Sequence, residues 1–151
     1  EVDRVAKGLM AAGVASGDHV AVWMTNRPEW VFTMFAAGKV GACLVPLNTR
    51  YRADDAAFTV ADSQASLMIT LDRSGPIGFA AMLQDARSQI EAAGHLRRSV
   101  VLDTTGGEGV ATVPGASSWD ELVAAGGRYA ELFAAWLAGV GAAYGGETIV
   151  D

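Results

Sequence analysis

Two short stretches of this sequence carry residue types that could bind phosphate. One is T-T-G-G-E-G at residues 104–109, where backbone amides and threonine hydroxyls could hold phosphate oxygens. Glu108 would place a negative charge beside that anion, so a surface loop with no phosphate role is the alternative. The other stretch is Arg50-Tyr51-Arg52, where a guanidinium beside an aromatic ring could clamp a phosphate and stack on a base. For Arg50, the alternative is a solvated loop arginine.

Other residue types that carry chemistry do not form a familiar pattern. His19 and His95 are the only histidines and lie far apart in the sequence, so we expect a turn or capping role for each rather than a metal site. Cys43 is the single cysteine, which excludes a disulfide within the chain and fits a reducing cytoplasm. Because Cys43 lies in a strand-like run, we expect it to be a small core residue. No G-x-S-x-G nucleophile elbow is present.

The composition is that of a globular protein rather than a disordered or nucleic-acid-binding one. The 151 residues are 51% hydrophobic and 19% charged, which is enough for one domain with a sizeable core. A formal net charge of -6 leaves no basic face for a phosphate backbone, so we exclude nucleic acid as a partner. The longest uncharged stretch, residues 132–146, is shorter than the ~20 apolar residues that span a bilayer. A start at Glu1 in a helical pattern indicates a piece of a longer protein.

The elements that must position these residues begin with a strand-helix-strand unit. Residues 19–24 and 42–47 are short apolar runs bounded by turn residues, which predicts strands buried on both faces. Residues 28–39 between them predict a helix with Pro28 at its first position. Apolar residues surround this helix almost completely, so we expect it to be covered on more than one side. Two strands joined in this way should be parallel, which predicts an α/β sheet flanked by helices.

The rest of the chain continues the alternation of helices and strands. Apolar spacing predicts helices over residues 2–12, 54–62 and 79–93, with Ala57 and Phe58 on the buried side of the second. Strands are expected at residues 67–69 and 99–103, and a glycine-rich mobile loop at 104–115. Ser118 and Glu121 form a capping box that begins a helix, which we expect to end near Gly126. Residues 128–140 predict a further, largely apolar helix.

The motifs of residues 17–48 resemble a known family. G-D-H-V-A-V-W-M-T-N-R-P-E-W at 17–30 and A-A-G-K-V-G-A-C-L-V-P-L-N at 36–48 are similar to the N-terminal region of acyl-CoA synthetases, the adenylate-forming AMP-dependent ligases. The similarity extends over residues 2–126 and then fades. It implies that residues 1–126 are part of an N-terminal AMP-binding-type α/β subdomain, and that residues 127–151 are a divergent helical tail.

The resemblance also implies a reaction and a binding residue. Members of this family use ATP and Mg to form an acyl-adenylate from an organic acid and then transfer the acyl group to coenzyme A. Arg50 matches the position that, in some relatives, lies near the nucleotide end of coenzyme A. The family's phosphate loop, [T/S]-S-G-T-T-G-x-P-K-G, is not reproduced, because the string at 104–109 lacks the proline and the lysine. The C-terminal catalytic lysine is also missing, so we expect the chain alone to bind none of these cofactors and to be inactive.

Three functions therefore remain open. The chain can be a scaffold piece of an acid–CoA ligase for a fatty or aromatic acid, with exposed apolar surfaces that meet the rest of the ligase or another copy. It can instead be a non-catalytic binding or interaction module built on the same scaffold. A flavodoxin-like nucleotide-binding domain is the third, and it requires a ligand near residues 25–27 or 48–50.

Overall fold

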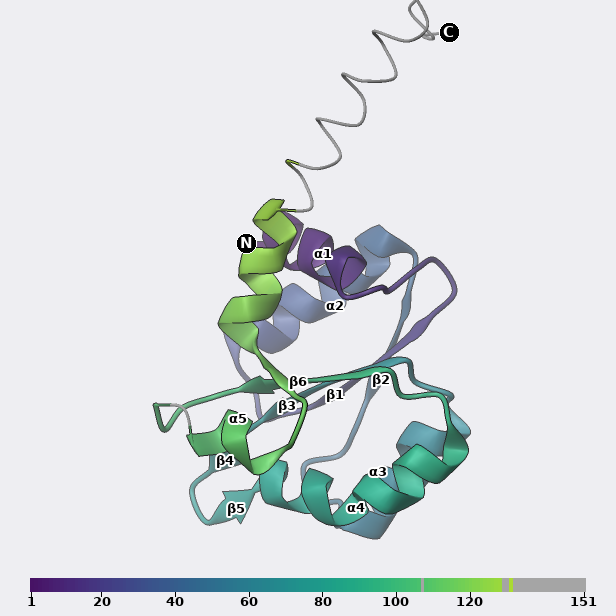
Figure 1. Cartoon of the computed structure of the whole chain (residues 1–151), viewed down its shortest axis with the longest axis vertical. Helices are drawn as coiled ribbons and strands as arrows, with labels where there is room; N and C mark the ends of the chain where they lie inside the picture. Colours follow the sequence, from purple (N-terminus) through teal and green to yellow (C-terminus); the bar gives the residue numbers. More distant parts are fainter. Residues whose placement is uncertain (107, 129–130, 132–151) are drawn as a thin grey trace, which may run out of the picture.

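The computed structural model of the chain describes residues 1–106, 108–128 and 131, and its centre is a parallel sheet (Figure 1). Five strands pair in the order β2-β1-β3-β6-β7, and each neighbouring pair is parallel. The predicted α/β fold is therefore confirmed, including the pairing of the two strands of the first unit. The strands are β1 (His19–Trp23), β2 (Cys43–Pro46), β3 (Leu67–Leu71), β6 (Arg98–Leu102) and β7 (Ser117–Ser118).

Helices cover both faces of this sheet, which gives three layers (Figure 1). On one face lie α1 (Val2–Ala11), α2 (Pro28–Val40) and a helix over residues 119–128. On the other lie α3 (Ala53–Asp62), α4 (Phe79–Ala93) and the short α5 (Glu108–Thr112). A two-stranded antiparallel hairpin that the sequence did not predict, β4 (Arg73–Ser74) with β5 (Ile77–Gly78), connects β3 to α4. Among the described residues, no helix is long and apolar enough to cross a membrane.

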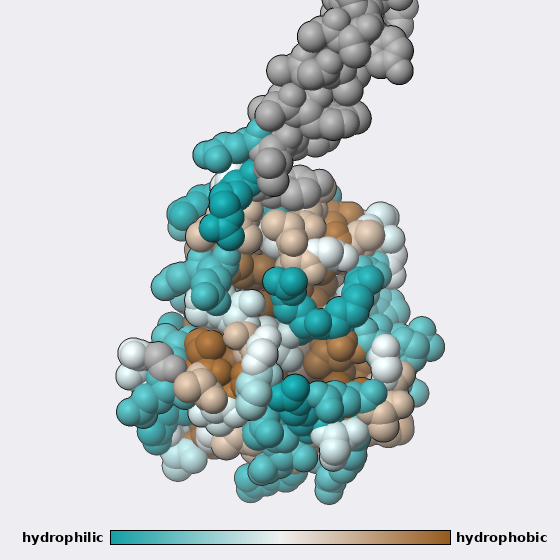
Figure 2. Space-filling view, in the orientation of Figure 1, coloured by the Kyte–Doolittle hydropathy of each residue, from teal (hydrophilic) through white to brown (hydrophobic). Residues whose placement is uncertain are grey.

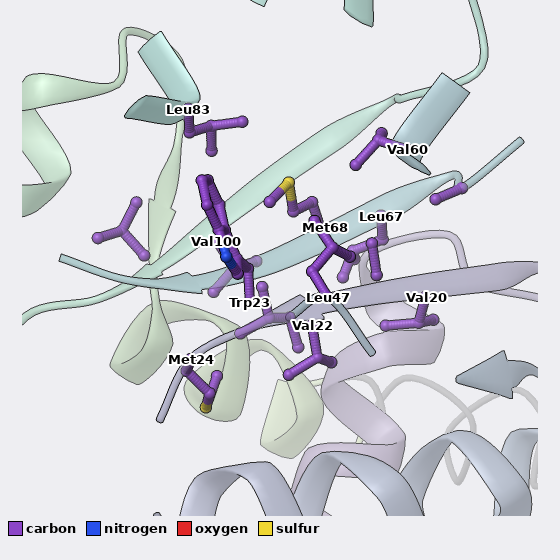
Figure 3. Packing of buried hydrophobic residues seen from close by; sticks show 14 of the residues in the cluster. Val20, Val22, Trp23, Met24, Leu47, Val60, Leu67, Met68, Leu83 and Val100 are labelled. Carbon is purple, nitrogen blue, oxygen red and sulfur yellow. The ribbon is translucent and has the colours of Figure 1, made fainter. Parts of the chain in front are cut away.

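Buried side chains of the neighbouring strands β1 and β3, among them Val22, Trp23 and Met68, lie together in the core (Figure 3). Every residue of β3 is buried, and residues 20–23 of β1 are fully inaccessible to solvent. This is what a continuous apolar run predicts, because a central parallel strand is covered on both faces. The Trp23 ring packs edge-on against Phe79 at the start of α4, with ring centroids 5.3 Å apart and planes at 83°.

Local signals set several helix ends where the sequence predicts them. Pro28 occupies the first turn of α2, and Gly41 ends that helix with a φ of 80°. Gly94 ends α4 in the same left-handed conformation, with a φ of 74°. Ser118 and Glu121 form the expected capping box, because the Ser118 N–H donates to Glu121 Oε2 at 2.8 Å and the Glu121 N–H donates to Ser118 Oγ at 3.1 Å.

Four expectations about burial are wrong. The strand at residues 42–47 is not buried on both faces, because β2 is an edge strand with β1 as its one neighbour in the sheet and none of its four residues is buried. Cys43 is accordingly exposed rather than in the core. Helix α2 is not enclosed between two layers as expected but has one side in solvent, since Val31 is 42% and Phe35 55% exposed. Phe58 is 70% exposed, because α3 turns the small side chains of Ala56 and Ala57 toward the core instead. On the face shown in Figure 2, brown hydrophobic residues lie recessed among teal polar ones.

The helix that begins after Ser118 is expected to end near Gly126 because of its glycines. The chain is instead still helical at Arg128. Gly126 instead allows a close approach to α1. A Cβ atom on Gly126 would lie 2.6 Å from the Arg4 carbonyl oxygen and 2.7 Å from the Gly8 nitrogen. The glycine therefore serves helix packing rather than helix termination.

Residues 104–115 are not a simple loop, because they contain α5. The predicted tail helix over residues 128–140 lies outside the described residues, apart from residues 128 and 131.

Candidate functional site

The polar segments that follow the strands lie at one edge of the sheet. Because the strands are parallel, the carboxyl ends of β1, β2, β3 and β6 all face that edge. Open α/β sheets bind ligands in the crevice outside these strand ends. Both phosphate-binding candidates of the sequence follow a strand at this carboxyl edge, Arg50 after β2 and the threonine string after β6.

The turn that carries Arg50 is held by hydrogen bonds from the core. The carbonyl oxygen of Asn48 accepts one bond from the indole Nε1–H of Trp23 at 3.1 Å and another from the Tyr51 N–H at 3.0 Å. The Asn48 side-chain oxygen accepts the Arg50 N–H at 3.0 Å. Since Trp23 is fully buried, its indole ties this exposed turn to the rigid centre of the sheet.

The guanidinium groups beside Tyr51 face solvent. Arg50 and Arg52 are both exposed, and neither side chain forms a hydrogen bond or an ion pair with the described residues. The Arg52 N–H donates to the Asp55 carboxylate at 3.0 Å, which fixes the start of α3. Arg27, which follows β1, is different, because its Nε lies 3.2 Å from Glu29 Oε2. The turn thus presents two arginines that could meet an anionic ligand.

The first threonine of the string at 104–109 is bonded to a buried carboxylate. Asp72, directly after β3, is only 4% exposed and accepts the Thr104 N–H and the Thr104 hydroxyl, each at 2.8 Å. The Arg73 N–H also donates to Asp72, at 2.6 Å. Sequence reasoning missed Asp72, although an acidic residue at the end of an apolar strand is a signal for this edge of the sheet.

The second threonine bonds to Asp103 in the same way. Asp103 Oδ1 accepts the Thr105 N–H at 2.7 Å and the Thr105 hydroxyl at 3.1 Å. Its Oδ2 accepts the Gly109 and Val110 N–H groups at 2.8 and 3.2 Å, at the first turn of α5. Carboxylates therefore occupy the donors that a phosphate would need, and they add negative charge. This arrangement supports a structural role for residues 104–109.

The two histidines line the same hollow, of about 320 Å³, near the amino ends of β1 and β6. His19 donates from Nδ1 to the Ser63 carbonyl oxygen, and His95 is exposed. Among the described residues, no group of three potential ligands could hold a metal ion. Asp18 in this hollow has a lowered pKa because its carboxylate accepts the Ala15 N–H and then the Arg97 guanidinium.

The family model for AMP-binding enzymes matches residues 1–137. The chain therefore belongs to the AMP-binding enzyme family. A crotonobetaine/carnitine–CoA ligase of Proteus mirabilis (strain HI4320) is 37% identical over 90 residues, which are 60% of this chain and 17% of that protein. The Citrobacter koseri ligase of the same name is 34% identical over 85 residues, 56% of this chain and 16% of the relative. The matched segments thus span about one sixth of the length of these ligases.

A solved structure shares the fold. The crystal structure of the anthranilate CoA ligase AuaEII in complex with anthranoyl-AMP matches with a TM-score of 0.68 and 21% sequence identity. The match covers 81% of this chain and 21% of the ligase chain. The resemblance to acyl-CoA synthetases and the α/β fold expected from it are confirmed.

Proposed function

We propose that this chain is part of the N-terminal scaffold of an ATP-dependent acid–CoA ligase that works through an acyl-adenylate, with a fatty or aromatic acid as substrate. The family match over residues 1–137 carries the proposal. The solved ligase that shares the fold was crystallised in complex with anthranoyl-AMP, which supports both the adenylate and an aromatic acid.

The whole ligase would bind ATP, Mg and coenzyme A, and the isolated chain would bind none of them productively. The N–H and hydroxyl groups of Thr104 and Thr105 and the Gly109 N–H are already bonded to Asp72 and Asp103, and the string has no lysine, so we infer that it does not take the place of a lysine-bearing phosphate loop. The role of this chain in the ligase is then to hold the carboxyl edge of its sheet in place. We propose the cytoplasm as its location, in keeping with a single, exposed cysteine.

A chimera tests the ligase function. Residues 1–126 would replace the corresponding segment of the Proteus mirabilis crotonobetaine/carnitine–CoA ligase, and acid-dependent pyrophosphate release would be measured. We expect adenylation to persist, because the scaffold is shared and the chemistry comes from the rest of the ligase. A folded chimera with no adenylation of any acid would contradict the proposal.

Arg50 is the residue that we propose contacts a phosphate of coenzyme A in the complete ligase. Its exposed guanidinium stands on a turn fixed by Trp23 and Asn48, so the charge is presented by a rigid support. In the chimera, Arg50→Ala should raise the KM for coenzyme A by about 10-fold, the loss of one hydrogen bond to a charged group. The acyl-adenylate half-reaction should not change. Arg4→Ala, far from the turn, is the control, and an unaltered KM in Arg50→Ala would remove the assignment.

The exposed apolar side chains support the proposal that this chain contacts another protein surface. Phe35 and Val31 on α2 and Phe58 on α3 lie on opposite faces of the sheet, and large exposed side chains of this kind often mark contact surfaces. In the ligase we propose that the remaining parts of the protein cover them, and that the isolated chain associates with itself.

The flavodoxin-like alternative has one observation in its favour. The strand order β2-β1-β3-β6-β7 is the order of flavodoxin-like sheets, whose ligand binds where β1 and β3 diverge. Titration of the purified chain with FMN tests this alternative, which requires saturable binding at the carboxyl ends of the strands, near residues 25–27 or 48–50. Saturable binding of acyl-CoA by a compact monomer, without FMN binding at that edge, would instead favour a non-catalytic binding module.

A further inference from the structure

We propose that a hollow between α4, the start of β6 and residues 113–115 binds a small organic monocarboxylate, with Arg98 pairing with its carboxylate group. This site goes beyond the proposed function. It lies at the amino end of β6, whereas Arg50 and the threonine string follow the carboxyl ends of their strands.

The size and floor of the hollow suit one ring or a short acyl chain. Its volume is about 160 Å³, and three nearly buried side chains, Leu83, Ile90 and Val113, line it with exposures of 3%, 2% and 5%. An apolar cavity of about 150 Å³ is large enough to hold benzene. The apolar part of the ligand is therefore a single ring or about six carbons.

Three arginines line the rim of the hollow, and one of them is available to bind a carboxylate. Arg87 Nε lies 2.6 Å from Glu91 Oε1, and its Nη1 donates to the Pro114 carbonyl oxygen at 2.9 Å. Arg97 lies 2.5 Å from Asp18 Oδ2. Arg98 forms no hydrogen bond or ion pair with the described residues, so one positive charge at the rim is uncompensated. A planar guanidinium can hold a carboxylate through two parallel hydrogen bonds.

The other hollows are less suited to a carboxylate that carries an apolar group. Arg98 and Arg128 also line a second hollow of about 360 Å³ together with Glu121, but among its described lining residues Leu122 is the one buried hydrophobic side chain, so it offers no apolar floor for a ring. The hollow near the β4-β5 hairpin, of about 210 Å³, is lined by the carboxylates of Asp72 and Glu108. The hollow against α4 combines an apolar floor with a free guanidinium, and the ligand class follows from that combination.

Benzoate titrated into the purified 151-residue chain, followed by ligand-observed NMR and calorimetry, tests the site. We expect saturable binding with a dissociation constant on the order of 1 mM, which is typical for so small a ligand. Arg98→Gln should weaken binding at least 10-fold, and Arg4→Gln, which removes an exposed arginine elsewhere, should leave binding unchanged. Toluene, which lacks the carboxylate, should bind the wild-type chain more weakly than benzoate.

Two further variants locate the ligand. Leu96→Trp fills the hollow against α4 and should abolish binding, whereas Ala125→Leu fills only the second hollow and should not. Thermal unfolding shows whether each variant is folded. If Leu96→Trp does not fold, the comparison of Arg98→Gln with Arg4→Gln decides whether the ligand binds at this hollow. Absence of saturable binding to the wild-type chain, or equal binding by Arg98→Gln, would overturn the proposal. Neither readout involves ATP or coenzyme A, so the ligase function is tested separately.

Discussion

Replacement of Gly126 by alanine should destabilise the protein, although alanine is the better helix former. The added Cβ would lie 2.6 Å from the Arg4 carbonyl oxygen, 0.8 Å short of the 3.4 Å at which ordinary contacts begin (3.4 − 2.6 = 0.8). The helix over residues 119–128 would have to move away from α1 by about that amount. Overpacking of this kind typically costs about 1–3 kcal/mol. We expect the free energy of unfolding to fall by that amount and Tm by roughly 3–10 °C.

Gly127 provides a matched control in the next position of the same helix. Beyond its chain neighbours and its own helix backbone, no atom of the described residues lies within 4 Å of a Cβ added there, so Gly127→Ala should stabilise the protein by about 0.5–1 kcal/mol through helix propensity alone. Urea titration followed by circular dichroism measures both variants. Equal stabilities, or a Gly126→Ala protein more stable than the wild type, would refute the close packing of this helix on α1.

Three further predictions concern the core turn, the amino edge and the exposed helix face. Trp23→Phe should lower the free energy of unfolding by about 1–3 kcal/mol, because it removes the hydrogen bond to the Asn48 carbonyl. Trp30→Phe is the control, since it removes no hydrogen bond among the described residues and should cost less. Urea unfolding measures both variants. The lowered pKa of Asp18 contributes stability above its ordinary value of 3.8, which is lost as pH falls through the folded-state pKa. Asp18→Asn should therefore flatten the decline of unfolding free energy below about pH 4, by no more than about 1 kcal/mol, and an unchanged profile would contradict it. Phe35→Asp should reduce self-association in sedimentation velocity, and a wild-type chain that is already monomeric would count against that surface.

The parts of the fold that follow from local chemistry could be predicted from the sequence. The bounds of α4 follow from the 3-4 spacing of Phe79 to Ile90 and from Gly94. The parallel pairing of β1 with β2 follows from two apolar runs separated by a helix.

The errors arise where tertiary position decides. Cys43 lies in an apolar run that is indistinguishable from a central strand, and only the strand order shows that β2 is an edge. Phe58 points outward because α3 packs through smaller residues, which a hydrophobicity pattern cannot show. Gly126 has two possible roles, helix end and helix contact, and the position of α1 decides between them.

The candidate site divides in the same way. The position of Arg50 on a polar turn after β2 could be predicted, because the apolar run of β2 ends at Pro46 and polar residues begin at Asn48. The role of Asp72 could not, because its partner Thr104 is distant in the sequence and is reached only through the pairing of β3 with β6.

Acid-dependent exchange of pyrophosphate into ATP by the purified 151-residue chain tests most directly whether these residues are a scaffold without chemistry of their own. The assay would supply Mg, ATP and a panel of fatty and aromatic acids, with an intact ligase as the positive control. We predict no exchange above the blank with any acid. Exchange that depends on both the acid and the chain would show that the chain adenylates by itself, and would contradict the account.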